Sequence, residues 1–178
     1  MAVAEALQGR HARLAPIEVA DAADIIAIRN QPGFDVGLPP IPDDVPRQRA
    51  WIDEQRGRPG DYYFGIRGND DPALLGTIGI TQEPTRPGPW ADNAWEWGRW
   101  VCIATDPRIA LESAALALGF AMNQGAPGIW VRILPGNAPL AEFHRRLGYS
   151  SCWENDGGTF LAATPADVLV LIRRLGLR

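Results

Sequence analysis

Two side chains in this sequence are suited to proton transfer, Glu96 and His144. Glu96 stands between two tryptophans, and a carboxylate among indoles is poorly solvated, which raises its pKa toward the range of a general base. His144 carries an imidazole, whose pKa lies near neutral pH and whose two tautomers can relay a proton. The pair therefore indicates a reaction in which one group takes a proton and another supplies one.

Each of these residues also has a purely structural interpretation. Glu96 could face solvent and pair with Arg99 or Arg132. His144 precedes two arginines, so it could be a surface residue on an arginine-rich helix. The elements that carry the two side chains decide between these interpretations.

The stretch 95–149 predicts a strand, a loop, a helix, a second strand and a second helix. Residues 95–103 alternate bulky apolar and polar side chains, which is typical of a strand with one buried face. Asp106 and Pro107 suit the N-cap and first position of a helix, which we expect from Pro107 to Asn123. The following strand is expected at 129–134 and the second helix at 137–147.

A strand, a helix and a strand at this spacing predict a right-handed crossover that joins two parallel strands. Ligands of such units bind at the carboxyl ends of the strands, close to helix N-termini. We therefore expect a ligand site between the strand that ends at Ile103 and the one that ends at Leu134.

The rest of the chain completes a single mixed α/β domain over residues 1–178, with a loose arm at 1–9. Further strands are predicted at 10–17, 62–66, 74–80, 150–154 and 159–162, and further helices at 19–30, from Asp43 or Asp44 to about Gly57, and at 164–175. The expected architecture is a central, mostly antiparallel sheet of six or seven strands that is splayed at one parallel pair, with helices on both faces. The Pro- and Gly-rich segment 31–46 is expected to shape a pocket.

Composition narrows the classes of partner. The 178 residues carry a net charge of −4, which argues against nucleic-acid binding because phosphate recognition needs a basic face. No segment reaches membrane-spanning length and the first residues lack a signal-peptide pattern, so we expect a cytoplasmic protein without a membrane partner. The two cysteines, Cys102 and Cys152, lack metal-ligand spacing, and no metal is expected.

Several short motifs occur in a characteristic order between Ile28 and Tyr149. They are IRNQP at 28–32, EWGRWV at 96–101, a helix with Glu112 in its second turn, FAM at 120–122, and the pattern Asn137, Leu140, Phe143, His144, Leu147, Gly148, Tyr149. This order resembles the GNAT acyltransferase superfamily, whose members move an acyl group from coenzyme A to an amine. The IRNQP element is similar to that of the branch that acetylates protein N-termini and sugar amines.

The resemblance implies roles for individual residues. His144 falls where relatives often carry a tyrosine that acts as general acid beside the thioester sulfur. Glu96 falls where a glutamate deprotonates the amine, directly or through water. The backbone N–H groups of Val101, Cys102 and Ile103 would hold the thioester oxygen. A further implied contact is that of Asn137 with the amides of the pantetheine arm, although Asn137 is also a good N-cap.

The expected donor is acetyl-CoA or another acyl-CoA, but the phosphate loop departs from the family pattern R-x-x-G-x-G/A. Arg108 replaces the key glycine and only Ala110 is retained. The helix dipole and the N–H groups of Ile109, Ala110 and Leu111 remain available for the pyrophosphate, and Arg108 could bind phosphate itself.

The altered loop also keeps an acyl carrier protein open as the donor. A carrier offers its acyl group on the same arm but has a single phosphodiester in place of the pyrophosphate and nucleotide. Arg108, Arg145 and Arg146, if they cluster, could dock an acidic carrier helix.

The acceptor is expected to be a small primary amine. Phe34, Tyr62, Trp90, Trp95 and Trp97 could line a pocket for a ring-shaped substrate such as an amino sugar, or could be core residues. Arg29 could pair with an acceptor carboxylate or phosphate, or could simply stabilise the end of its helix.

Three other functions stay open as alternatives. They are acetylation of a nucleotide-linked amino sugar, acetylation of a protein N-terminus, and non-catalytic binding of coenzyme A or an acyl carrier. We expect a monomer or a homodimer.

Overall fold

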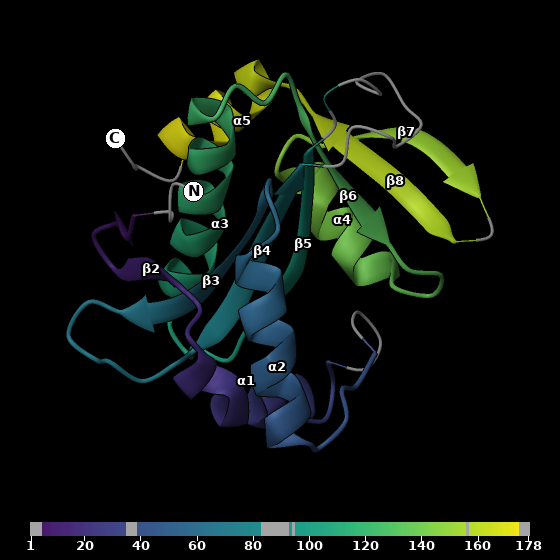
Figure 1. Cartoon of the computed structure of the whole chain (residues 1–178). Coiled ribbons are helices and arrows are strands. Elements are labelled where there is room, and N and C mark those ends of the chain that lie inside the picture. Colours follow the sequence, from purple (N-terminus) through teal and green to yellow (C-terminus); the bar gives the residue numbers. More distant parts are fainter. Residues whose placement is uncertain (1–4, 35–38, 83–92, 94, 156, 175–178) are drawn as a thin grey trace.

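The computed structural model describes residues 5–34, 39–82, 93, 95–155 and 157–174 (Figure 1). Within these residues one sheet has the strand order β1-β2-β3-β4-β5-β6-β8-β7. Its strands are β1 (Leu7–Gln8), β2 (Ala12–Pro16), β3 (Asp61–Gly68), β4 (Gly76–Gln82), β5 (Trp95–Cys102), β6 (Ile129–Ile133), β7 (Ser150–Asn155) and β8 (Gly158–Ala163). The helices are a 3-10 turn at Val19–Asp21, α1 (Ala22–Arg29), α2 (Val45–Arg56), α3 (Pro107–Asn123), α4 (Ala138–Arg146) and α5 (Pro165–Arg174).

The sheet separates two layers of helices, as expected. Two consecutive residues of β3 illustrate this. Phe64 packs in the cluster that includes α3, α4 and α5 residues, whereas Tyr63 packs with α1 and α2. Figure 1 shows α1 and α2 together at the bottom of the view and α3 with α5 at the upper left. The predicted mixed fold with helices on both faces is confirmed.

The described sheet has eight strands, where the sequence predicted six or seven. The extra strand, β1, lies in the segment expected to be a loose arm and pairs Leu7 with Leu14 of β2. The buried carboxylate of Glu112 on α3 fixes the turn between these strands, because it accepts the backbone N–H groups of Arg10, His11 and Ala12 at 2.7, 2.5 and 2.6 Å. The expectation of a loose arm is therefore wrong at Leu7–Gln8.

One neighbouring pair of strands, β5 and β6, is parallel, which confirms the predicted crossover. The pairing covers only two positions, Trp95 with Ile129 and Glu96 with Trp130, and the other described neighbours are antiparallel. Figure 1 shows β5 and β6 side by side where they begin and well apart where they end. The sheet is thus splayed where the sequence predicted a ligand site.

A bulge in β5 lies beside this splay. Gly98 pairs with Gly79 and Val101 with Thr77, so two residues of β5, Arg99 and Trp100, oppose Ile78 alone. Arg99 adopts a φ of 51°, in the left-handed region that a residue with a side chain rarely occupies. Such bulges redirect side chains. This one reverses the alternation of β5, so that Trp100 and not Arg99 shares the α3 face with Trp95 and Trp97, and Arg99 lies on the α1 and α2 face.

Local signals in the sequence account for the helix starts. Asp106 caps α3 by accepting from the Arg108 N–H at 2.9 Å, and Asp44 caps α2 by accepting from the Arg47 N–H at the same distance. Each helix has a proline in its first turn, where a missing N–H breaks no helical hydrogen bond. In the part of the chain that the structure describes, no helix is both long and apolar enough to cross a membrane.

Candidate active site

A pocket of about 610 Å³, which we call the splay pocket, lies where β5 and β6 separate. Trp100, Val101 and Cys102 of β5 form one wall, and Asn137, Leu140 and Phe143 form the facing wall. Ala110 of α3 and Phe34, which follows α1, close two further sides. The pocket combines aromatic and aliphatic walls with a few backbone and amide groups, which suits a long, flexible chain that carries amides.

The backbone of β5 offers fewer free donors than the sequence predicted. The Ile103 N–H donates to the Leu75 carbonyl at 2.8 Å, so it cannot also hold a thioester oxygen. Val101 pairs with Thr77 of β4, and strand alternation turns its N–H to the same side as that of Ile103. This leaves the N–H of Cys102 as the group of the predicted three that faces the splay.

Asn137 stands at the mouth of the splay pocket and caps α4. Its Oδ1 accepts from the Leu140 N–H at 3.2 Å, which confirms the capping role. Because the same residue lines the pocket, its amide nitrogen lies close enough to the walls to contact a bound chain. The two roles predicted for Asn137 are compatible.

A carboxylate of the chain itself, that of Asp106, lies at the start of α3. The Asp106 carboxylate caps the helix and also binds the Arg108 guanidinium, with Nη2 2.7 Å from Oδ2. This hydrogen bond with the Arg108 side chain, helped by the Arg108 N–H, lowers the pKa of Asp106 to about 2. The Ile109 N–H donates to the Asp106 carbonyl at 3.1 Å. The expectation of a free N–H at Ile109 is therefore wrong, and the Arg108 guanidinium that was expected to bind phosphate is paired with Asp106. The N–H groups of Ala110 and Leu111 stay predicted phosphate donors.

The arginines proposed to dock a carrier helix are placed differently from one another. Arg108 is at the start of α3, whereas Arg145 and Arg146 are in the last turn of α4, beyond the residues of that helix that line the splay pocket. Arg108 is paired with Asp106, and Arg146 with Glu142 at 3.1 Å. The arrangement gives the carrier-protein donor no specific support.

His144 is buried inside an aromatic cage and is only 3% exposed. Its ring centroid is 4.7 Å from that of Trp97, 5.2 Å from Tyr149 and 5.5 Å from Phe143. Burial lowers the pKa of the imidazole to about 4. The surface interpretation is wrong, and so is the expectation of a pKa near neutral, because the cage excludes the water that would stabilise the imidazolium.

The cage borders the splay pocket through Phe143, which stacks on Trp100 at 5.4 Å. Four buried polar atoms of this region have no hydrogen-bond partner among the described residues: His144 Nδ1, Tyr149 Oη, Trp97 Nε1 and Trp100 Nε1. Buried polar atoms are nearly always paired in native proteins. Of these four residues, Trp100 lines the splay pocket, and the other three are buried in the cage beside it.

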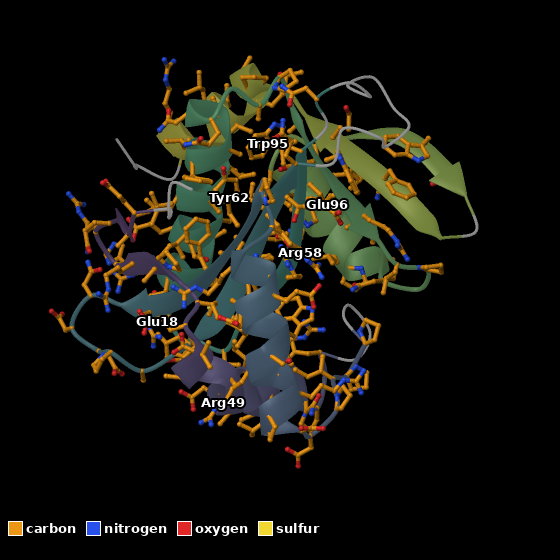
Figure 2. All side chains as sticks on the ribbon, in the orientation of Figure 1. Glu18, Arg49, Arg58, Tyr62, Trp95 and Glu96 are labelled. Carbon is orange, nitrogen blue, oxygen red and sulfur yellow. The ribbon has the colours of Figure 1, made fainter. Side chains whose placement is uncertain are left out.

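Glu96 lies on the opposite face of β5 from the neighbouring indoles. Trp95 and Trp97 are 2% and 3% exposed in the core with α3, while Glu96 is half-buried on the face of α1 and α2. In Figure 2, Trp95 and Tyr62 lie close together toward α3, and Glu96 lies on the side of β6. The expected cage of flanking indoles is wrong because alternate strand residues point to opposite faces.

The two arginines that the structural interpretation of Glu96 names both make other contacts. Arg99 forms an ion pair with Asp61, and Arg132 donates from Nε to the Gly157 carbonyl at 3.0 Å. Across the sheet Glu96 sits beside Thr81 of β4 and Trp130 of β6.

A second pocket, of about 290 Å³, lies between the sheet and α2, and we call it the arginine pocket. Arg29, Arg47 and Arg99 line it together with the aromatic rings of Trp51 and Tyr63. The Arg99 guanidinium packs over the Tyr63 ring at 4.9 Å and donates to Thr81 Oγ1 at 3.0 Å. This pocket shares the α1 and α2 face with Glu96.

The predicted acceptor residues divide between several places. Arg29 lines the arginine pocket and Phe34 the splay pocket. Tyr62 stacks on Trp95 at 6.2 Å, and both belong with Trp97 to the core on the α3 side, so these three are not walls of an acceptor pocket on the other face. Trp90 lies outside the described residues.

Sequence reasoning missed Trp51, Tyr63 and Arg99. Strand alternation requires Tyr62 and Tyr63 to point to opposite faces, so one of the pair had to lie on the α2 side. No sequence signal announces the bulge that turns Arg99 toward the same pocket. In the described residues no group of three or more His, Cys, Asp or Glu side chains is placed to hold a metal ion.

Residues 11–150 match the sequence profile of the family described as Acetyltransferase (GNAT) domain. The chain belongs to the GNAT acetyltransferase family. This GNAT protein is therefore an acyltransferase, an enzyme class whose fold generally uses acetyl-CoA and an amine acceptor. The splay pocket fits the pantetheine arm of such a donor, since it pairs apolar walls with the Cys102 N–H and the Asn137 amide. The start of α3 fits the pyrophosphate poorly because Asp106 is there.

Solved structures of other GNAT proteins share the fold. Apo FdhC, described as a nucleotide-linked sugar GNAT, has 21% identity and a TM-score of 0.81 over 96% of both chains. A probable GNAT-family acetyltransferase from Chromobacterium violaceum has 19% identity and a TM-score of 0.73 over 94% of both chains. A putative ribosomal-protein-serine acetyltransferase from Vibrio cholerae has 14% identity and a TM-score of 0.69 over 93% of this chain and 100% of its own. No curated protein sequence is significantly similar to the chain.

Proposed function

We propose that this GNAT acyltransferase moves an acyl group, most simply acetyl, from an acyl-CoA to the primary amine of a small molecule. The bulge in β5 carries the proposal. Trp100 lines the splay pocket on one face of the sheet, and the adjacent Arg99 lines the arginine pocket on the other. A donor in the first pocket and an acceptor that enters from the second would meet at this one segment of β5.

The donor would be held by residues of the splay pocket. The thioester oxygen accepts the Cys102 N–H, the Asn137 amide contacts the arm, and Trp100, Leu140 and Phe143 exclude water from it. Excluding water matters because it strengthens a hydrogen bond to the oxygen on which charge develops.

The reaction joins the amine nitrogen to the acyl carbon as the carbon–sulfur bond breaks. Glu96 is the proposed base that takes a proton from the amine. Release of that proton from Glu96 to water, and uptake of one proton from water by the departing thiolate, returns the base to its starting state and gives the free thiol. His144 is proposed to act beside the sulfur from the cage that adjoins Phe143, and a pKa of about 4 leaves its imidazole neutral at pH 7. It would act by donating a hydrogen bond from a ring N–H, not by carrying a positive charge. Positioning of a reactive thioester supplies the remaining rate.

Blocking the splay pocket tests this proposal. Leu140→Trp should weaken acetyl-CoA binding, measured by calorimetry, and should slow thiol release in the presence of amines by at least about 10-fold, as expected when a substrate is misplaced. Val170→Trp is a matched control, because Val170 is exposed on α5. Equal binding and turnover in both variants would place the donor elsewhere.

An acyl carrier protein is the second candidate donor, and the observation that favours it is the Asp106 carboxylate at the start of α3. A carrier has one phosphodiester to place there, whereas coenzyme A has a pyrophosphate. Thermal shifts with coenzyme A, acetyl-CoA and an acylated carrier protein separate the two. Stabilisation by the carrier alone would overturn the choice of coenzyme A.

Among acceptors, an amino sugar linked to a nucleotide is the finer alternative, supported by the likeness to FdhC. A protein N-terminus is supported by the weaker likeness to the Vibrio cholerae protein. A non-catalytic binding module would bind acetyl-CoA and release no thiol with any amine.

A further inference from the structure

The arginine pocket contains a guanidinium with no carboxylate partner. Arg29 ends α1 and is partly buried, and its Nη2 donates to the Pro39 carbonyl at 2.9 Å. Its Nε is buried and has no hydrogen-bond partner among the described residues. Burial lowers the pKa of Arg29; the Tyr63 hydroxyl opposes this shift, and the nearby charge of Arg99 acts in the same direction as burial. The site thus lacks the negative charge that a buried cation normally requires.

Two other partly buried arginines, Arg67 and Arg99, do have such a partner. Arg67 pairs with Asp21 at 2.6 Å, and Arg99 pairs with Asp61. No ion pair of Arg29 with a described carboxylate exists. The contrast with Arg67 and Arg99, together with the buried and unpaired Nε, points to a partner from outside the chain.

The side chains that line the arginine pocket carry more positive than negative charge. Arg29, Arg47 and Arg99 line it, against a single carboxylate, Asp44. Asp44 is exposed, and its Oδ1 is bound to the backbone N–H of Arg47 as the cap of α2. Because Asp61 compensates Arg99, two cations, Arg29 and Arg47, face the one carboxylate of Asp44, so the pocket keeps an excess of positive charge. Convergent guanidinium donors of this kind select carboxylates and phosphates.

The size and walls of the pocket limit what the anion can be attached to. A volume of about 290 Å³ corresponds to roughly ten water molecules at ~30 Å³ each. Trp51 and Tyr63, whose rings meet edge to face at 5.6 Å, provide flat apolar walls. A pocket of this volume with these walls suits one anionic group attached to a sugar ring or to a short side chain.

The pocket also lies at the right place for an acceptor. Arg99 forms part of its wall and is followed by Trp100, a wall of the splay pocket. An anion held at Arg29 would leave the far end of the same small molecule directed toward the bulge in β5.

We propose that the arginine pocket is an anion subsite that binds the carboxylate or phosphate of an acidic amine acceptor, with Arg29 as its principal ligand. This inference rests on the acyltransferase function proposed above. An amino acid and an amino sugar phosphate share the required chemistry, and matched substrates distinguish them.

The first test measures transfer from acetyl-CoA to matched amines: glucosamine 6-phosphate against glucosamine, and phenylalanine against phenylalaninamide. The expected result is that one acidic member exceeds its neutral partner in kcat/KM by about 10- to 100-fold, the effect of one or two charge-assisted hydrogen bonds. Which pair shows the preference identifies phosphate or carboxylate. Equal rates within both pairs would overturn the anion subsite and leave acyl transfer to amines intact.

The second test uses Arg29 variants. Arg29→Gln should remove the preference by raising KM for the acidic amine more than KM for its neutral partner, and Arg29→Lys should restore part of the preference. Arg49→Gln, on the exposed surface of α2 (Figure 2), is the matched control and should keep the preference. A preference that survives in Arg29→Gln would overturn the assignment to Arg29.

A third measurement separates this inference from the proposed reaction. Calorimetry with inorganic phosphate and with acetate, in the absence of any donor, should show binding to the native chain that Arg29→Gln loses. Phosphate or acetate binding without transfer to any amine would uphold the subsite and overturn the acyl transfer. If neither anion bound but neutral amines were still acetylated, the subsite would be overturned and the acyl transfer upheld.

Discussion

The imidazole of His144 meets the indole of Trp97 edge to face, with ring centroids 4.7 Å apart and planes at 73°. The contact joins α4 to β5 immediately behind the splay pocket, and it buries a titratable group that has an unpaired Nδ1. A proton added to this imidazole would be a charge inside an aromatic cage. Stability near neutral pH and below therefore depends on His144 staying neutral.

The stability of the protein should fall as pH drops from about 6.5 to about 4. The pKa of His144 is lowered to about 4 in the folded state. Between about pH 6.5 and 4 the imidazole is therefore protonated in the unfolded chain but neutral in the native chain, and this difference favours unfolding. The free energy of unfolding should fall by about 3 kcal/mol in all. The loss is absent above pH 6.5, the unfolded-state pKa of histidine, and nearly complete at about pH 4, its folded-state pKa. Urea unfolding from pH 7.5 to 4.5 measures it.

The control for this pH effect is His144→Phe, which removes the titrating group and keeps an aromatic ring. Carboxylates contribute equally to both proteins, so the difference between the two pH profiles isolates His144. Parallel profiles would mean that the imidazole titrates in the native state as it does in water.

Replacing Glu112 by Gln should destabilise the fold by about 3 kcal/mol or more, since hydrogen bonds to a charged group contribute about 1.5–3 kcal/mol each. The wild-type carboxylate accepts three backbone N–H groups, whereas an amide turns an NH2 donor toward them. Denaturant unfolding gives the loss. Glu142→Gln, which removes an exposed pair with Arg146, should cost no more than about 0.5 kcal/mol, and comparable losses in both would discount the buried network.

Asp106→Asn should strengthen coenzyme A binding about 2- to 5-fold, the effect of one charge at a helix N-terminus. Asparagine caps a helix as well as aspartate does, but it would free Arg108 and the start of α3 for a phosphate. Calorimetry with coenzyme A and with acetylpantetheine, which has no phosphate, measures the change. If the gain appeared for both molecules alike, the phosphates would not lie at this helix.

Breaking the Arg99–Asp61 pair should cost about 3–5 kcal/mol, because the remaining charge is left largely buried. Arg99→Ala and Asp61→Ala should each show this loss in denaturant unfolding, and the double variant should lose less than the sum. The pair is 22% and 10% exposed at its side chains, and Arg99 is also held by its stacking on Tyr63. Additive losses would show that the two residues stabilise the bulge independently.

Signals that act over a few residues made much of the fold predictable. The helix expected from Pro107 to Asn123 is the α3 observed, because the Asp106 cap and the proline after it act within one turn. Asn137 and Asp44 likewise mark the starts of α4 and α2. The parallel strands on either side of α3 follow from the length of the crossover.

Several expectations were wrong because they depended on contacts between residues that are far apart in the sequence or on opposite faces of the sheet. The first strand was missed because Glu112, which fixes the turn after it, is 100 residues away from Ala12 in the sequence. The setting of Glu96 was mistaken because sequence neighbours of a strand residue occupy the opposite face. The pKa of His144 was mistaken because its burial depends on Trp97 and Tyr149, which come from other elements.

The sequence by itself determined the order of strands and helices, their caps, the parallel crossover and the splay at its end, because periodicity and capping are local properties of the chain. Only the tertiary structure decided which side chains share a pocket. It turned Arg99 and Trp100 to opposite faces, put Tyr63 and not Tyr62 beside Arg29, and set Asp106 against Arg108 at the start of α3. These outcomes depend on a bulge and on packing between distant segments, where small differences in position decide which groups meet and which stay apart.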